Sequence, residues 1–292
     1  MKITHLRPAA RRRDMAPQSP LSAAAAILAL RPEVPVACLR PAIATSGAAR
    51  FVAAFPGAVL YAVKCNPDEA LLRALADGGI RHFDAASIAE VRLVRRLLPA
   101  AEIHFMHPVK ARSAIREAYF EHGVRDFVFD TQAELDKILS ETDHAADLGL
   151  VVRLGLAKGK ARLDLSGKFG AEPLAAAILL RRAATITGRV GLSFHVGSQC
   201  CDPGAWEKAL AVAGDTIAHA GVDLAILDVG GGFPIAYPDT RPPPLEAFMA
   251  AIRRGVARLR LPPACALWCE PGRALVAAAQ SLIVQVQGRR DD

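Results

Sequence analysis

Short apolar runs alternate with longer segments of helical periodicity from residue 59 to residue 269 of the chain. The apolar runs are nearly continuous, which is typical of strands that are buried on both faces of a parallel sheet. The pattern predicts eight strands, at residues 59–63, 81–83, 103–106, 126–129, 148–154, 190–194, 224–229 and 264–269. It also predicts helices around these strands, at residues 47–55, 68–76, 88–97, 111–120, 133–139, 174–183, 206–218 and 245–259.

Strands that alternate with helices in this way indicate an α/β fold, a closed (β/α)8 barrel of the TIM type. A doubly wound open sheet is the alternative. That fold usually has a glycine-rich turn after its first strand, whereas here the first strand is followed by Lys64, Cys65 and Asn66. The closed barrel is therefore the favoured architecture.

Three regions are expected along the chain: an N-terminal arm at 1–33, the barrel at 34–273, and the start of a C-terminal β domain at 274–292. Residues 21–30 are alanine-rich and helical in character, but shorter than the roughly 20 apolar residues that cross a bilayer. Residues 274–287 are expected to form a strand, and residues 34–39 are its candidate neighbour, because a lone strand cannot bury itself. An unpaired apolar strand there would lower solubility.

Composition narrows the function classes. The chain has 292 residues, of which 52% are hydrophobic, and its net charge is +7. Arginines are scattered apart from one run, Arg11–Arg13, and aromatic residues make up only 5%, so the stacking platform of a nucleic-acid binder is missing. A basic surface instead suits anionic small molecules. The six cysteines have no CxxC or zinc spacing, so we expect a reducing, cytoplasmic location.

Polar residues and glycines follow the predicted strands, at the end where barrel enzymes place their active sites. By chance one or two strands would be so equipped, because strands usually end in polar turns. The residues that close the eight runs are Lys64, Asp84, His107, Asp130, Arg153, His195, Gly230–Gly232 and Glu270–Arg273.

Lys64 emerges from a buried strand and is the candidate nucleophile. Partial desolvation is expected to lower the pKa of its amine, which would make it more reactive toward an aldehyde. The alternative is a lysine whose amine extends into solvent.

Three consecutive glycines, Gly230–Gly232, follow the seventh strand, and Gly272 and Arg273 follow the eighth. Glycines let backbone N–H groups approach a phosphate closely, and barrels often build phosphate sites from these two loops. A pair of tight turns is the alternative for the glycines alone.

Three more residues are candidates at the same end of the barrel. Glu270 must be paired if it is buried, and either a pyridinium nitrogen or an arginine could be its partner. His195 could stack on an aromatic ring or be a satisfied core histidine, and Ser198 is a candidate phosphate donor or a turn residue. His104 and His107 have no third ligand at usable spacing, so no metal site is expected.

The motifs around these residues resemble those of the ornithine/diaminopimelate/arginine decarboxylase family, enzymes of fold type III that use pyridoxal 5′-phosphate (PLP). Lys64-Cys65-Asn66 is similar to ornithine decarboxylases, whereas diaminopimelate decarboxylases usually have alanine at the position of Cys65. Phe105–Lys110 is similar to bacterial ornithine or lysine/ornithine decarboxylases. The other matching motifs are Tyr61–Val63, Phe83–Ser87 with Glu90, Leu165–Gly170, Phe194–Ser198, Asp228–Pro234 and Glu270–Arg273.

The resemblance implies a role for each site residue. Lys64 attaches PLP covalently, His195 stacks on its ring, and Glu270 binds the pyridine nitrogen. The implied phosphate ligands are Ser198, Gly230, Gly231, Gly232, Gly272 and Arg273. Asp84, Glu90 and Arg153 line the surroundings of the cofactor and the lysine.

The implied reaction is decarboxylation of the amino acid L-ornithine to putrescine by a cytoplasmic homodimer. The family continues with a C-terminal β domain that carries a Cys-Asp motif and a phosphate-contacting tyrosine, and neither lies in these residues, so little turnover is expected from this chain alone. Lysine, arginine or diaminopimelate are alternative substrates. A non-catalytic PLP-binding or regulatory barrel, and an inactive partner of a longer paralogue, are alternative functions.

Overall fold

The computed structural model describes residues 22–157 and 168–290 of the chain. It divides the chain into two compact units, of which the larger comprises Pro41–Ala279. The smaller unit combines the chain up to Arg40 with the segment from Gln280 onward. The helix that begins at Arg273 packs against the helix Pro41–Ala54 within the larger unit.

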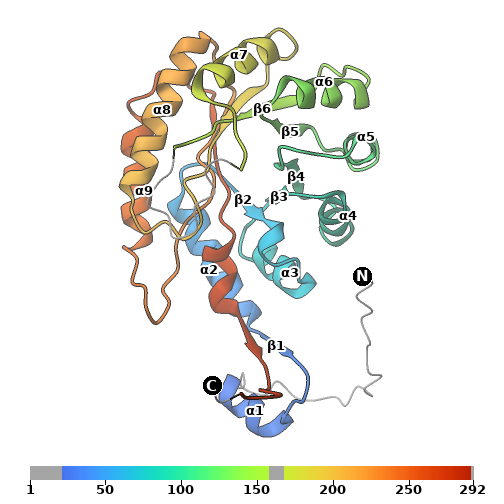
Figure 1. Cartoon of the computed structure of the whole chain (residues 1–292), viewed down its shortest axis with the longest axis vertical. Helices are drawn as coiled ribbons and strands as arrows, with labels where there is room; N and C mark the ends of the chain where they lie inside the picture. The colour runs from blue at the N-terminus through green and yellow to red at the C-terminus, as the bar shows by residue number, and fades with distance from the viewer. Residues whose placement is uncertain (1–21, 158–167, 291–292) are drawn as a thin grey trace. The chain divides into compact units, whose positions relative to one another are not determined.

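The larger unit is a closed barrel of eight parallel strands in the order of the chain, as expected (Figure 1). The ring closes where β2 pairs with β9, with Ala58 opposite Trp268 and Val59 opposite Cys269. The strands are β2 (Ala58–Ala62), β3 (His82–Ala85), β4 (Glu102–Phe105), β5 (Asp126–Phe129), β6 (Gly149–Arg153), β7 (Val190–Ser193), β8 (Ile226–Asp228) and β9 (Ala266–Cys269).

Helices separate consecutive strands of the barrel (Figure 1). Several begin at a side-chain cap, since the side chains of Asp68, Ser87 and Thr131 each accept a backbone N–H of the first turn. The first helix is longer than expected because it begins at Pro41, and proline is well suited to a first helical position. The helices are α2 (Pro41–Ala54), α3 (Glu69–Asp77), α4 (Ile88–Leu97), α5 (Arg112–Phe120), α6 (Gln132–Glu141), α7 (Pro173–Ala184), α8 (Gly204–Ala220), α9 (Leu245–Val256) and α10 (Arg273–Val276).

A chain of polar side chains lies at the amino-terminal end of the barrel. His82 Nδ1 lies 3.1 Å from His104 Nε2, and His104 Nδ1 lies 2.8 Å from Asp126 Oδ2. Arg189 donates to both oxygens of Asp126, at 2.8 and 3.1 Å. Because a carboxylate only accepts, His104 must carry its proton on Nδ1, which leaves Nε2 to accept from His82. A Cβ at Gly149 would lie 1.9 Å from Asp126 Oδ1, so the neighbouring strand must begin with glycine.

Asp126 is expected to contribute to stability. Burial acts to raise the pKa of its carboxyl, but hydrogen bonds from His104 and Arg189 lower it to about 2. Relative to the usual value of 3.8, this lowering corresponds to about 2 kcal/mol of folding free energy. Because the pKa is depressed in the folded state, that stability is present above pH 3.8 and is lost as the pH falls through about 2.

We therefore predict that Asp126→Asn lowers the free energy of unfolding by about 2 kcal/mol at pH 7. Urea unfolding measures it, with Asp136→Asn on the exposed surface of α6 as the control. The difference in the free energy of unfolding between wild type and Asp126→Asn should become smaller as the pH falls below 4. If this difference were the same at every pH, the stabilising role of the Asp126 charge would be contradicted.

The smaller unit contains α1 (Ala23–Leu30) and a two-stranded antiparallel sheet. Its strands are β1 (Val36–Leu39) and β10 (Gln280–Ile283), and they pair along their whole lengths, from Val36 opposite Ile283 to Leu39 opposite Gln280. The Arg40 guanidinium also donates to Ser281 Oγ at 2.8 Å.

This pairing confirms residues 34–39 as the neighbour of the C-terminal strand and corrects the expectation that residues 274–287 form one strand. Their first part is helical, in α10 and in the 3-10 helix Ala277–Ala279, because alanine is the best helix former and the segment is alanine-rich. The strand is therefore short, and it is not unpaired, because residues 36–39 supply its partner. Apolar side chains in this strand and after it are nevertheless exposed, among them those of Leu282, Val284 and Val286.

Within the described ranges, no helix combines the length and the apolar character that a membrane crossing requires.

Candidate active site

The carboxyl-terminal ends of the barrel strands bring the candidate residues together. Lys64 lies in the 3-10 helix Val63–Cys65 directly after β2, and Asp84 lies opposite Ala62 on β3. Arg153 ends β6, His195 follows β7, and Glu270 follows β9. A cavity of about 620 Å³ opens among them, and four of the candidates line it: Lys64, Arg153, His195 and Glu270.

The other walls of the cavity come from the loops after β4 and β6 and from α8. They include His107 and Phe169, whose rings are in edge contact at 5.1 Å. The phosphate candidates Ser198, Gly230–Gly232, Gly272 and Arg273 do not line this cavity. They lie in the loops after β7, β8 and β9, with Arg273 at the start of α10. Of the motif Leu165–Gly170, residues 165–167 lie outside the described part of the chain.

The Lys64 amine is held by a carboxylate. Its Nζ lies 3.0 Å from Oδ2 of Asp84, which is fully buried, while 53% of the lysine side chain remains exposed. The Asp84 charge raises the pKa of Lys64, assisted by Glu270, against the lowering effect of burial. The expected lowering of the pKa of Lys64 is therefore wrong, because strand pairing places a carboxylate beside the amine. Lys64 is protonated at neutral pH in this arrangement, and its proton is shared with Asp84.

Glu270 is buried beside a second carboxyl group, that of Asp228. Burial raises the pKa of Glu270 well above its usual value, and the nearby charges of Asp228 and Asp84 raise it further. Oε1 of Glu270 has no hydrogen-bond partner among the described residues. A buried acceptor without a donor is costly, so this atom is suited to a donor that arrives with a ligand.

Asp228 is a site residue to which the sequence analysis gave no role. Its Oδ1 accepts the N–H of Gly230 at 2.8 Å, and burial raises the pKa of its carboxyl. The side chain thus fixes the start of the glycine turn while also facing Glu270. A signal was present in the sequence, since Asp228 is the one charged residue inside an otherwise apolar run.

The His195 imidazole is neutral. Burial and the positive charges of Arg153 and Lys64 lower its pKa to about 3. Its Nδ1 accepts the N–H of Gly197 at 2.9 Å, so the ring proton is on Nε2. A neutral ring held in one orientation on the cavity wall is suited to stacking against a planar ligand.

The turn Gly230–Gly232, which we call the glycine turn, requires glycine for two reasons. Gly230 and Gly232 have φ angles of +66° and +103°, which other residues rarely adopt. A Cβ at Gly230 would lie 1.9 Å from the carbonyl oxygen of Phe194, and one at Gly231 would lie 2.5 Å from that of Glu270. The loops after β7, β8 and β9 can therefore meet only if these side chains are absent.

Gln199 joins two of these loops, and the sequence analysis did not single it out. Its Nε2 donates to the carbonyl of Ile235 at 2.5 Å, and its Oε1 accepts the N–H of Ile235 at 3.1 Å. Phe233, directly after the glycine turn, stacks on Trp206 with ring centroids 4.9 Å apart. These contacts fix the loop after β8 against the loop that carries Ser198.

Arg273 begins α10 beside the glycine turn. Its Nη1 donates to the hydroxyl oxygen of Tyr237 at 3.0 Å, and its buried Nε has no acceptor among the described residues. A Cβ at Gly272 would lie 2.9 Å from the Cβ of Cys65, so glycine is needed where this loop passes the lysine segment. Glu90, expected near the cofactor, accepts the N–H of Ala86 at 2.7 Å and thereby caps the start of α4.

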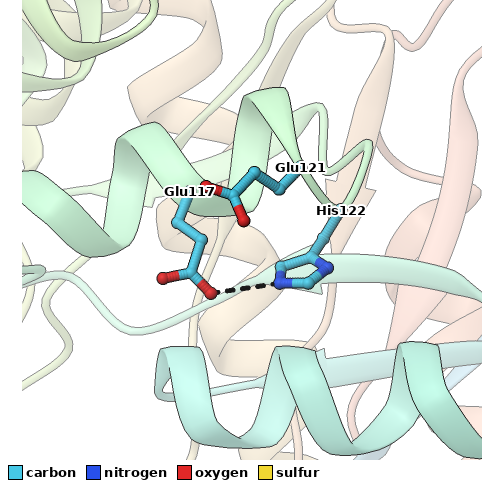
Figure 2. A group of neighbouring side chains, drawn as sticks. All are labelled: Glu117, Glu121 and His122. Carbon is cyan, nitrogen blue, oxygen red and sulfur yellow. Dashed lines mark hydrogen bonds and ion pairs between the residues drawn. The ribbon is translucent and has the colours of Figure 1, made fainter.

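The structure contains one further group of potential metal ligands within its described residues, Glu117, Glu121 and His122 (Figure 2). Glu117 already accepts from Nε and Nη2 of Arg92, both at 2.5 Å, and lies 3.1 Å from His122 Nε2. The hydrogen bonds from Arg92 lower the pKa of Glu117 to about 2. A cation here would have to displace a guanidinium, so an ion-pair network between α4 and α5 explains the group.

Two polar atoms of the site that have no partner among the described residues, Oε1 of Glu270 and Nε of Arg273, fit the expected cofactor. PLP would offer an aldehyde to the amine of Lys64 and a ring nitrogen to Oε1 of Glu270. Its phosphate would suit the unpartnered Nε of Arg273 and the closely approaching backbone of the glycine turn. The residues present therefore fit this group.

Comparison with known proteins agrees with this geometry. Residues 45–277 match the profile of the family described as pyridoxal-dependent decarboxylase, pyridoxal binding domain. The lysine/ornithine decarboxylase of Selenomonas ruminantium is 37% identical over 238 residues, which cover 80% of this chain and 58% of that protein. The ornithine decarboxylase of Panagrellus redivivus is 39% identical over 234 residues, which cover 77% of this chain and 52% of that protein.

Among solved structures, the lysine/ornithine decarboxylase of Vibrio vulnificus complexed with putrescine superimposes with a TM-score of 0.76 at 29% identity. The match covers 93% of this chain and 73% of that one. The chain spans about half the length of the curated relatives it matches.

Proposed function

Because the chain belongs to the family of pyridoxal-dependent decarboxylases, through their pyridoxal binding domain, we propose that it binds PLP and catalyses decarboxylation of a basic amino acid. The substrate that we propose is L-ornithine, which yields putrescine. The cytoplasmic location and the homodimer expected from the resemblance are parts of the same proposal.

Each candidate residue has a task in this proposal. Lys64 would attach the cofactor, Glu270 would pair with its ring nitrogen, and His195 would stack on the ring. The glycine turn, Ser198, Gly272 and Arg273 would hold the phosphate, and Asp84 and Arg153 would set the charge around Lys64 and His195. When bound, PLP withdraws the electron pair that remains on the α-carbon as CO₂ leaves.

One observation carries the proposal: a lysine amine and a buried glutamate whose Oε1 has no partner among the described residues face the same cavity. Lys64 Nζ donates to Asp84 Oδ2 at 3.0 Å, so the amine has a fixed position and a neighbouring proton acceptor. The neutral His195 ring adds no charge to the cavity wall. A planar aldehyde could therefore be held at its two ends, by Lys64 at the aldehyde and by Glu270 at the ring nitrogen.

The choice of ornithine rests on the form Lys64-Cys65-Asn66 and on relatives that are named ornithine or lysine/ornithine decarboxylases. Ornithine and lysine differ by one methylene, which a pocket distinguishes by roughly 10- to 200-fold in kcat/KM. We predict a preference for ornithine in this range when CO₂ release is measured with ornithine, lysine, arginine and diaminopimelate. Faster release from any of the other three would overturn the choice of substrate and leave the reaction type intact.

A second candidate function is a barrel that binds PLP without turnover. Only two acidic residues, Asp202 and Glu270, line the cavity within the described part of the chain. Asp202 Oδ1 caps the start of α8 through the N–H of Gly204 at 2.9 Å, and Glu270 is assigned to the ring nitrogen. The distal amine of a diamino acid thus has no dedicated acceptor on these walls. PLP binding without CO₂ release from any of the four amino acids, when the chain is assayed together with a C-terminal β domain of the family, would favour this second function.

A further inference from the structure

Two hydrogen-bond donors in the segments after β8 and β9 have no acceptor among the described residues, and their side chains are hydrogen-bonded to each other. The buried Nε of Arg273 has no partner among the described residues. The same guanidinium donates through Nη1 to the oxygen of Tyr237 at 3.0 Å. Since the tyrosine oxygen is the acceptor in that bond, its own O–H must donate elsewhere, and no acceptor for it occurs in the described structure.

The position of Tyr237 is fixed by its loop. Residues 237 and 240 pair through two backbone hydrogen bonds of 3.0 Å, which close a tight turn. Two residues earlier, Ile235 is held at both its N–H and its carbonyl by Gln199. Phe233 anchors the start of the same loop against Trp206 and Phe51. These contacts hold the loop in place, so that Tyr237 is kept beside Arg273 although 38% of the tyrosine is exposed.

Unmet donors on two adjacent side chains suit an acceptor with several oxygens and a negative charge. A phosphate group meets both conditions, and hydrogen bonds to it are charge-assisted and strong. We propose that the Tyr237 hydroxyl is a direct ligand of the PLP phosphate, beside Arg273 and the glycine turn. This inference rests on the proposed function, because it takes the phosphate of PLP as the anion.

The test compares PLP with pyridoxal, which has the same ring and aldehyde but no phosphate. The 292-residue chain and its Tyr237→Phe variant are titrated with each ligand, and binding is followed by ligand absorbance. Tyr119→Phe is the matched control, because Tyr119 lies on α5 and donates to Asp147 instead. We expect Tyr237→Phe to raise the Kd for PLP about tenfold, the usual effect of losing one hydrogen bond to a charged group, with the Kd for pyridoxal unchanged.

Inorganic phosphate gives a second readout that needs no cofactor. It should raise the midpoint of thermal unfolding of the wild type and of Tyr119→Phe, and raise that of Tyr237→Phe less. Wild-type PLP affinity in Tyr237→Phe, or equal losses for PLP and pyridoxal, would overturn the inference while the proposed function stands. A wild-type chain that binds neither PLP nor pyridoxal would overturn both.

Discussion

Lys64→Ala is expected to abolish the absorbance band of bound PLP and to lower any decarboxylation rate at least about a thousandfold. The physical reason is that no other lysine amine in residues 22–157 and 168–290 pairs with a buried carboxylate on this wall of the cavity. Lys64 Nζ lies 3.0 Å from the buried Asp84 carboxylate, on the wall that Glu270 and His195 share. Removing it leaves the Asp84 charge unpaired and the aldehyde without a nucleophile.

Lys208→Ala is the matched control, because Lys208 also lines the cavity but extends from α8. The band should persist in Lys208→Ala, and Lys64→Arg should lose it, since arginine keeps the charge but does not attach an aldehyde. An unchanged band in Lys64→Ala would remove the basis of the cofactor assignment.

Glu270→Gln is expected to slow decarboxylation by about a hundredfold to a thousandfold, the usual cost of deleting one preorganised electrostatic group. Glutamine has nearly the same shape but cannot carry the negative charge that stabilises a protonated ring nitrogen. PLP should still bind, since Lys64 and the phosphate ligands are intact. The rate is measured at saturating substrate, together with the absorbance of bound PLP.

The control for this prediction is Glu246→Gln on α9, which removes one charge of the exposed ion pair between Glu246 and Arg50 of α2. It should have the wild-type rate. If Glu270→Gln also had the wild-type rate, the unpartnered Oε1 would need another explanation, and the ring of the ligand would lie in a different orientation.

The strands and helices of the barrel could be read from the sequence because their periodicity is local. Buried parallel strands give continuous apolar runs, and the polar residue after each run marks the end that carries the site. Residues 274–279 were misjudged because an alanine-rich apolar segment is compatible with either a strand or a helix, and only packing decides between them.

The electrostatics of the site could not be read in the same way. The pKa of Lys64 depends on Asp84, which is distant in sequence and becomes a neighbour only through the register of β2 with β3. Gln199 and Tyr237 likewise act through loop-to-loop contacts that have no periodic pattern. Lys64, Asp84, Glu270 and the glycines were identifiable because their residue types are unusual at strand ends, whereas the pairing of Lys64 with Asp84 and the contacts of Asp228, Gln199 and Tyr237 were not.

The pairing of β1 with β10 has a consequence for synthesis on the ribosome. Residues 36–39 are made first, but their partner at 280–283 is made only after every strand of the barrel. At about 5–20 residues per second, β1 waits roughly 10 to 50 seconds with its edge open to chaperones or to other nascent chains. A deletion of residues 280–283 would make that temporary state permanent.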